Sequence, residues 1–462
     1  MRATLPAVSD LKEWYRLHQR EILEDYFTFL KFPSLSTDPA YKLSVRETAL
    51  WLKEFLQKCG LCAELWETTG HPVVFASLLH AGPDRPTLLF YAHYDVQPVD
   101  PIGEWHSDPF DPVLKEGKVY ARGASDNKGQ CFYTLCAIRA YLELMKESAV
   151  NIKVFIEGEE EIGSLGTAGI LASKEKELKS DYLFLLDFGI SNAHSPAVMM
   201  GMRGLLSLEV TVQNSAIDLH SGVHGGMALN PNHALLSALS KMWTESGRIA
   251  IPGFFDDVAL PAQEELDRYD LSFDPVSYKN KFGIKVCIPT PGASLLESNW
   301  FYPSLDVNGM YGGYCGEGFK TVIPAKARAK ISCRLVPHQD PHKIAEALTA
   351  FLKNHLSENL HVEIKILQQH ASYRAAWDTN VVKISKEAYE EVFSKECRYL
   401  LCGATVPLVP KLAFYSGGEA ALIGVALDSD DMHAPNEHFD LERFEKGFLV
   451  IGRILISCSS FS

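Results

Sequence analysis

Residues 87–95 read TLLFYAHYD, a short β-rich apolar run that ends in a histidine and an aspartate. Side chains i and i+2 of an extended chain point to the same side, so His93 and Asp95 can face one site. Open α/β sheets bind ligands at the carboxyl ends of their strands, which is where this pair stands. Taken alone, a His-x-Asp pair more often has a structural role.

Similar β-rich runs lie on both sides of this stretch and alternate with helical patterns. The predicted strands are Val73–Leu79, Thr87–Ala92, Ile152–Glu157 and Tyr182–Asp187. Amphipathic helices are predicted at residues 10–31 and Arg46–Lys58, and a long buried helix at Lys128–Leu144. Apolar strands separated by helices predict an α/β fold, with a mostly parallel sheet covered by helices on both faces.

The pattern changes after Gly204, where apolar and polar residues alternate along a strand with one wet face. Half-exposed strands with helices between them predict an inserted two-layer α+β domain at 204–375. The catalytic domain would then consist of 1–203 and 376–462. Its last part is predicted to contain a helix, an apolar strand and a closing helix, at Val381–Phe393, Val409–Tyr415 and Leu441–Ser457.

Composition excludes several classes of protein. The 462 residues carry 44 Lys and Arg against 58 Asp and Glu, a net charge of −14, whereas a nucleic-acid partner requires a basic face. No apolar run approaches the ~18 residues of a membrane span, and the N-terminal stretch has no apolar signal core. Ten cysteines in so long a chain form no disulfide scaffold. We therefore expect a cytoplasmic protein with no nucleic-acid or membrane partner.

Further polar groups stand at strand ends or helix starts. Asp126, in RGASDNKG at 122–129, directly precedes the buried helix and could be either a ligand or its N-cap. The run EGEEEIGS at 157–164 would ordinarily be a solvated charged surface. Here it leaves a buried-type strand, where repulsion among its carboxylates requires a cation. Asp187 ends the run 182–186, and His433 lies in DDMHAPNE at 430–437.

All these groups are imidazoles or carboxylates, without a thiolate among them. That donor set suits two Zn²⁺, Mn²⁺ or Co²⁺ ions, whereas a structural zinc site favours cysteine. A carboxylate shared by two ions roughly 3.5–4 Å apart is the usual two-metal arrangement for hydrolysis. Such a centre needs five protein ligands and a base near the attacking water, and the sequence supplies that number.

The chain resembles the metallopeptidase family that includes aminoacylase, acetylornithine deacetylase, succinyl-diaminopimelate desuccinylase, glutamate carboxypeptidase and carnosinase. It is most similar to the branch of cytosolic nonspecific dipeptidase and carnosinase. The resemblance covers nearly the whole chain. The motifs that carry it are YAHYDVQP (91–98), GASDNKG (123–129), EGEEEIGS (157–164), DLHSG (218–222), KTVIPAK (320–326) and RLVP (334–337).

The resemblance implies a set of protein ligands for two ions, of which Zn²⁺ is favoured over Mn²⁺ or Co²⁺. His93 and Asp187 would hold one ion, Glu161 and His433 the other, and Asp126 would bridge the two.

The same resemblance implies four supporting roles. Asp95 would orient His93, and Glu160 would be the general base. His220 would project from the inserted domain, in relatives often across a dimer, to stabilise the oxyanion. Arg334 would meet the free carboxylate of the substrate. The alternatives are that His220 is a hydrogen-bonded turn residue and that Arg334 forms an ion pair on a strand surface.

One stretch departs from the family pattern. Close dipeptidase relatives carry an Arg before a Gly-Gly-Ser or Gly-Gly-Thr turn near the C-terminus, whereas residues 414–420 here read FYSGGEA. If this turn lines the substrate pocket, Ser416 and Gly417 contact the substrate. Recognition of a carboxylate would then be weakened, or a cationic group preferred.

The leading functional hypothesis is hydrolysis of dipeptides or short peptides by a water that two metal ions activate. The alternative is an N-acyl amino acid deacylase with the same centre, because a fold does not determine a substrate. A third hypothesis is a non-catalytic metal-binding relative. The inserted domain is expected to form a homodimer contact.

Overall fold

The computed structural model describes residues 5–460, which divide into two compact units. Unit 1 is formed by Met1–Met200, Ala375–Leu400 and Val406–Ser462, and unit 2 by Gly201–Arg374 and Leu401–Thr405. The chain thus leaves unit 1 twice. The second excursion, five residues long, had no signal in the sequence pattern.

The centre of unit 1 is a mixed sheet whose four inner strands are parallel. These inner strands, in spatial order, are β6 (Asn151–Glu157), β3 (Thr87–His93), β7 (Tyr182–Leu185) and β17 (Glu419–Leu422). Antiparallel strands flank them: β2 (Val73–Leu78) and then β1 (Cys62–Trp66) on one side, and β8 (Ala197–Met202) on the other. The predicted α/β class is confirmed, with the parallel part confined to the inner strands.

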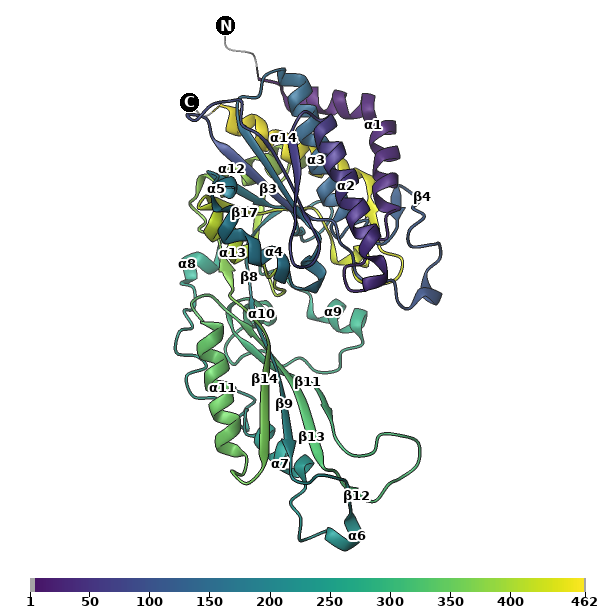
Figure 1. Ribbon diagram of the computed structural model, residues 1–462. Coiled ribbons are helices and arrows are strands. Elements are labelled where there is room, and N and C mark those ends of the chain that lie inside the picture. The colour runs from purple at the N-terminus through teal and green to yellow at the C-terminus, as the bar shows by residue number, and fades with distance from the viewer. Residues whose placement is uncertain (1–4, 461–462) are drawn as a thin grey trace. The chain divides into compact units, whose positions relative to one another are not determined.

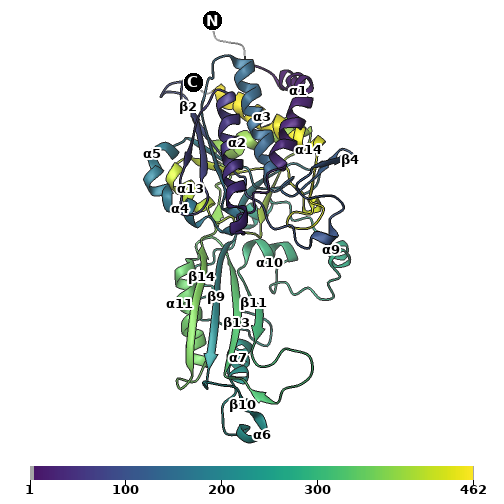
Figure 2. The ribbon, with the colours of Figure 1, turned by 45° about the vertical axis from the view of Figure 1, so that its right-hand side comes forward.

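Helices lie on both faces of this sheet. In Figures 1 and 2, α1 (Val8–Leu30), α2 (Lys42–Lys58), α3 (Lys128–Met145) and α14 (Leu441–Ser459) gather on one side. The helices α4 (Leu165–Ile170), α5 (Glu175–Leu178) and α13 (Val409–Ser416) gather on another, and α12 (Asn380–Phe393) packs on α14 and β17. The α3 helix is buried on nearly all sides because it lies among α1, α14 and β3.

The strand predicted at 409–415 is wrong, because those residues form helix α13. A short apolar run cannot be assigned to strand or buried helix by periodicity alone. Pro410 decides the matter: it would remove a ladder hydrogen bond from an inner strand but is tolerated in the first turn of a helix. The strand of this region is β17, which begins at Glu419.

Unit 2 has two layers. Its antiparallel sheet has the order β11 (Ser304–Tyr311), β13 (Lys326–Leu335), β9 (Gly204–Gln213) and β14 (His361–His370). Burial alternates along β9 and β13, as expected for strands with one face in the core. Helices α7 (Pro231–Ser240) and α11 (Pro341–His355) pack against that face.

The remaining elements are short. In unit 1 they are β4 (Val113–Lys115), β5 (Lys118–Tyr120) and β18 (His438–Asp440), which form a small antiparallel sheet. In unit 2 they are β10 (Leu219–His220), β12 (Val322–Ile323), α6 (Ser221–His224), α8 (Gln263–Leu266), α9 (Pro275–Phe282) and α10 (Leu295–Phe301). Strands β15 (Tyr373–Arg374) and β16 (Arg398–Cys402) pair with β8. Within residues 5–460, no helix combines the length and apolarity that crossing a bilayer requires.

Candidate metal centre

The predicted ligands converge at the carboxyl edge of the parallel strands. The register pairs His93, the last residue of β3, with Glu157, the last residue of β6. On the other side of β3, Tyr91 pairs with Leu185 at the end of β7, two residues before Asp187. Parallel strands therefore bring His93, the 157–161 run and Asp187 to one edge, as the sequence pattern predicts.

Two groups of potential ligands form at this edge. In the first, His93 Nε2 lies 3.1 Å from Asp126 Oδ1 and 3.5 Å from Asp187 Oδ1. In the second, His433 Nε2 lies 2.8 Å from Asp126 Oδ2 and 3.4 Å from Glu161 Oε2. Each group offers three ligand atoms within 4.8 Å of one another, and Asp126 belongs to both. The structure thus brings together the five residues predicted as ligands.

Asp95 lies behind the first group, fully buried. His93 Nδ1 forms a hydrogen bond with the Asp95 backbone oxygen at 3.1 Å and lies 3.4 Å from Asp95 Oδ1, so that His93 presents Nε2 to the ligand group. The Asp95 carboxylate also accepts the backbone N–H groups of Glu160 at 3.2 Å and Glu161 at 3.1 Å. Asp95 therefore orients the histidine and fixes the backbone of the two glutamates at the same time.

The carboxylates of the 157–161 run do not form a solvated charged surface. Glu157 is buried and accepts a hydrogen bond from the Tyr91 hydroxyl, and Glu159 is buried and accepts the backbone N–H of Thr167. Glu161 accepts a hydrogen bond from Gln97 at 2.7 Å through Oε2. Its buried Oε1 has no hydrogen-bond partner among the described residues. An orphaned carboxylate oxygen beside other carboxylates is the arrangement that a cation satisfies.

The electrostatics of the second group also fit a cation. Hydrogen bonds with Asp126 and Glu161 raise the pKa of His433 to about 11. Burial, with Asp126 beside it, raises the pKa of Glu161 to about 7. The cluster retains protons because its carboxylates lack countercharge, and a divalent ion would provide that charge instead. The all-nitrogen-and-oxygen donor set suits Zn²⁺, Mn²⁺ or Co²⁺.

Glu160 is the remaining carboxylate of the cluster. Burial raises its pKa well above the ordinary value. His93 opposes this shift, while Asp187 and the neighbouring carboxylates add to it. A carboxylate that gains a proton readily can act as a general base and then as an acid.

Several residues next to the predicted ligands in the sequence form hydrogen bonds with them. These supporting residues were not predicted from the sequence. Asn127 donates to Asp187 Oδ1 at 3.0 Å and accepts the backbone N–H of His93 at 3.2 Å. Asn127 is also the N-cap residue of α3, so the N-cap alternative for Asp126 is not observed. Glu437 accepts the backbone N–H of Asp126 at 2.9 Å. Gln97, Asn127 and Glu437 all lie inside the motifs quoted above, which was the available signal.

His220 and Arg334 belong to unit 2. His220 is exposed, and its Nδ1 accepts the backbone N–H of Gly222 at 3.0 Å, as the turn alternative expects. Arg334 forms no ion pair among residues 5–460, so the alternative of a strand-surface pair is not observed. Its Nη1 donates to Thr405 Oγ1 at 2.8 Å.

A second arginine lies beside this pair. Thr405 Oγ1 donates to the backbone oxygen of Arg203 at 2.6 Å, and Arg203 Nε donates to the Gly403 backbone oxygen at 3.0 Å. Burial and the charge of Arg334 lower the pKa of Arg203 to about 10. Neither guanidinium forms an ion pair within residues 5–460, and the charge of Asp306 offsets only part of their positive charge, so the pair forms a setting suited to an anion.

Ser416 and Gly417 are not brought to the ligand groups. Ser416 ends α13, and Gly417 follows it in the left-handed conformation. Both precede β17, whose first residue pairs with Tyr182 at the start of β7, so they lie at the amino edge of the parallel strands. Glu419 accepts the backbone N–H of Val381 in the first turn of α12. The departure in this turn thus has a structural reason: its carboxylate binds a helix N-terminus.

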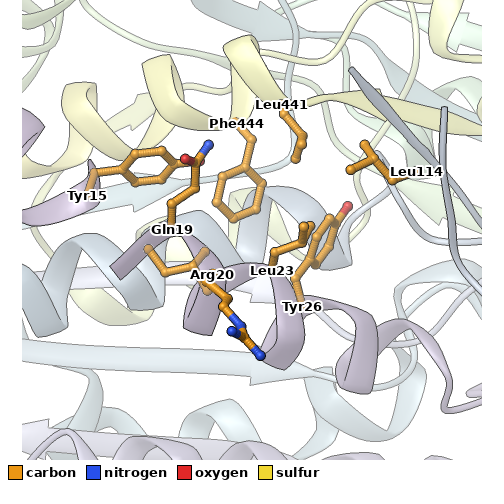
Figure 3. A pocket seen from close by; sticks show the side chains of 9 residues that line it. Tyr15, Gln19, Arg20, Leu23, Tyr26, Leu114, Leu441 and Phe444 are labelled. Atoms are coloured by element: carbon orange, nitrogen blue, oxygen red, sulfur yellow. The ribbon is translucent and has the colours of Figure 1, made fainter. Parts of the chain in front are cut away.

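A hollow of about 290 Å³ elsewhere in unit 1 is lined mainly by α1 and the start of α14 (Figure 3). Tyr15, Leu23 and Phe444 are among its apolar walls, and none of the predicted site residues lines it. Tyr26, also in its wall, donates a hydrogen bond to the Ala124 backbone oxygen at 2.6 Å. The hollow therefore borders the back of the loop that carries Asp126, rather than the ligand groups.

Comparison with known proteins agrees with this geometry. The chain is 31% identical to the human Beta-Ala-His dipeptidase, covering 81% of this chain and 75% of that protein. It is 28% identical to the Cys-Gly metallodipeptidase of Schizosaccharomyces pombe, covering 90% and 91% respectively. The crystal structure of an M20 family metallo-carboxypeptidase from Sulfolobus solfataricus matches with a TM-score of 0.85 at 33% identity, over 96% of this chain and 100% of that one.

A family model also matches most of the chain. The model described as Peptidase family M20/M25/M40 matches residues 89–457, a span that contains both ligand groups. Because this match covers most of the sequence, the chain belongs to peptidase family M20/M25/M40.

Proposed function

We propose that this protein is a cytoplasmic dipeptidase that hydrolyses the peptide bond of dipeptides or short peptides with two divalent ions, preferably Zn²⁺. The observation that carries the proposal is the sharing of Asp126 by two groups of ligand atoms. Its relatives include proteins named Beta-Ala-His dipeptidase and Cys-Gly metallodipeptidase, in support of metal-dependent dipeptide hydrolysis.

Each ion would have its own ligands. His93 and Asp187 would hold one, Glu161 and His433 the other, and Asp126 would bridge them. When bound, two such ions lower the pKa of a water molecule and polarise the scissile carbonyl. The protein's part is to hold five ligands at one sheet edge, with Asp95 keeping His93 in the orientation that presents Nε2.

Glu160 would move the proton. Its carboxylate accepts a proton from the attacking water and later returns that proton to the leaving amine nitrogen. Its raised pKa suits both steps, because a carboxylate of ordinary pKa returns a proton poorly near neutral pH. His220 would stabilise the oxyanion, a role that rests on the family resemblance.

Arg334 would recognise the free carboxylate of the substrate. Its Nη1 is already oriented by Thr405, and Arg203 adds positive charge beside it. A carboxypeptidase and a dipeptidase both cleave the bond next to a terminal carboxylate, so both need a group that binds this carboxylate. Proteins with these two names are related to this chain. Unit 2 would also form the contact of a homodimer, for which its sheet offers the edge strands β11 and β14.

The experiment that tests the proposal is hydrolysis by apo-protein reconstituted separately with Zn²⁺, Mn²⁺ and Co²⁺. A panel of dipeptides is compared with N-acetyl and N-succinyl amino acids at matched concentrations. We expect metal-dependent release of free amino acids from dipeptides. Faster release of acetate or succinate would instead identify a deacylase, and no turnover of either class with any metal would contradict the proposal.

A further inference from the structure

The loop that carries Asp126 has no regular secondary structure to hold it. Residues 121–127 lie between the end of β5 at Tyr120 and the start of α3 at Lys128. Two buried carboxylates from the stretch that carries His433 bind this loop instead. Asp430, which precedes His433 in the sequence, accepts a hydrogen bond from the Ser125 hydroxyl at 2.9 Å. Glu437, which follows His433, accepts hydrogen bonds from the backbone of the loop.

Glu437 is completely buried and every hydrogen bond it accepts comes from this loop. Its Oε1 accepts the backbone N–H groups of Ser125 and Asp126, both at 2.9 Å. Its Oε2 accepts the Gly123 backbone N–H and Arg122 Nη1, both at 2.8 Å. Four donors therefore meet on one side chain.

Only a carboxylate can satisfy this arrangement. An ionised carboxylate accepts through both oxygens, whereas an amide would turn an NH₂ group toward two of the four donors. The adjacent Arg122 guanidinium neutralises the buried charge of Glu437 at 2.8 Å. Replacing Glu437 by glutamine would thus preserve its shape and disrupt half of its hydrogen bonds.

Asp126 is the residue shared by the two ligand groups, and its own backbone N–H binds Glu437. We propose that Glu437 is the positioning residue of the bridging carboxylate, so that it controls the affinity for both metal ions at once. This inference rests on the proposed metal centre. It assigns Glu437 no contact with substrate or with the ions.

Gln97 provides the matched comparison. It donates to Glu161 Oε2 at 2.7 Å, so it supports a ligand of the second group only. Loss of this hydrogen bond in Gln97→Met should lower the affinity for one ion and leave the affinity for the other unchanged. The two variants therefore distinguish support of a bridging ligand from support of a single ligand.

The test is a spectroscopic titration of apo-protein with Co²⁺, together with chelator competition for Zn²⁺ and the thermal midpoint of the metal-free protein. In Glu437→Gln we expect both stepwise affinities to fall roughly 10–100-fold, with a changed Co²⁺ absorption spectrum. In Gln97→Met we expect only one affinity to fall. If Glu437→Gln does not fold, the same measurements are made on Glu437→Asp. This variant keeps the negative charge, but its side chain is one methylene shorter, so its oxygens lie farther from the four donors.

Two results would overturn the inference: affinities within twofold of the wild type in the Glu437 variant that folds, or loss of a single ion in that variant. A lowered thermal midpoint with unchanged affinities would likewise reduce Glu437 to a structural role. A wild-type protein that binds no pair of ions would refute the metal centre itself. Metal binding is measured without any peptide, so the choice of substrate does not affect these outcomes.

Discussion

Asp126 and His433 are separated by 307 positions in the chain, yet Oδ2 of the aspartate lies 2.8 Å from Nε2 of the histidine. The other oxygen of the same carboxylate lies 3.1 Å from His93. A side chain that meets two imidazoles through different oxygens can bridge two ions. This relationship supports the proposed two-metal centre, because it joins the two ligand groups through a single carboxylate.

The sharing of Asp126 leads to a prediction about metal content. Asp126→Asn should lose both ions on dialysis because it alters both groups, whereas Asp187→Asn should retain one because Asp187 belongs to the first group only. Elemental analysis per chain after dialysis measures the difference. Equal retention by the two variants would argue against a shared ligand.

Glu160→Gln should separate catalysis from metal binding. We expect kcat to fall by about 10²–10⁴-fold, the usual contribution of a general base, with metal content unchanged at two per chain. Glu177→Gln, at a half-buried carboxylate on α5 that pairs with Lys174, is the control and should retain full activity. Loss of an ion in Glu160→Gln would identify Glu160 as a ligand instead.

Much of this site could be predicted from the sequence because strand ends and motif spacing locate His93, Glu161 and Asp187 without tertiary information. The positions of Glu437 and Gln97 within their motifs were visible, but their partners lie 311 and 64 positions away. Such partnerships depend on how loops meet, which periodicity does not encode.

The position of the turn at 416–419 depends on the tertiary structure in the same way. Comparison with the family pattern led us to expect Ser416 and Gly417 at the substrate if this turn lines the pocket. Helix α13 precedes the turn where a strand was predicted, and β17 begins at Glu419. The residue that actually meets Arg334 is Thr405, in a five-residue excursion of the chain to unit 2. A tertiary crossing of this kind leaves no local pattern.

Arg334 and Thr405 predict selectivity for a free terminal carboxylate. Arg334→Met should raise KM for dipeptides roughly 10–100-fold, since hydrogen bonds to charged groups contribute about 1.5–3 kcal/mol. Dipeptide amides, which lack that carboxylate, should be poor substrates of the wild type and little affected by the substitution. Arg328→Met, at a half-buried position on β13 where the guanidinium lies over the Tyr311 ring, is the matched control. An equal loss for acid and amide substrates would contradict carboxylate recognition.

Thr405→Val removes the hydroxyl that orients the guanidinium while keeping the shape of the side chain. We expect a smaller rise in KM than in Arg334→Met, with kcat nearly unchanged. Steady-state kinetics on one dipeptide are sufficient. A fall in kcat at constant KM would place Thr405 closer to the reacting bond than this interpretation allows.

The loss of stability on removing the metals should be larger at higher pH. Glu157 and Glu161 have folded pKa values of about 7, raised by burial from 4.5. The folded apo-protein therefore binds more protons than the unfolded chain between these values, so its free energy of unfolding falls as the pH increases through them. The raised pKa of His433 acts in the same direction above pH 6.5. Bound ions replace the protons of Glu161 and His433, which belong to the second ligand group, so the stabilising effect of the ions grows with pH. Thermal midpoints of loaded and chelator-treated protein, compared at about pH 5.5 and pH 8, should differ more at the higher pH. A difference that stays constant or shrinks would mean that these carboxylates are not the groups that the ions neutralise.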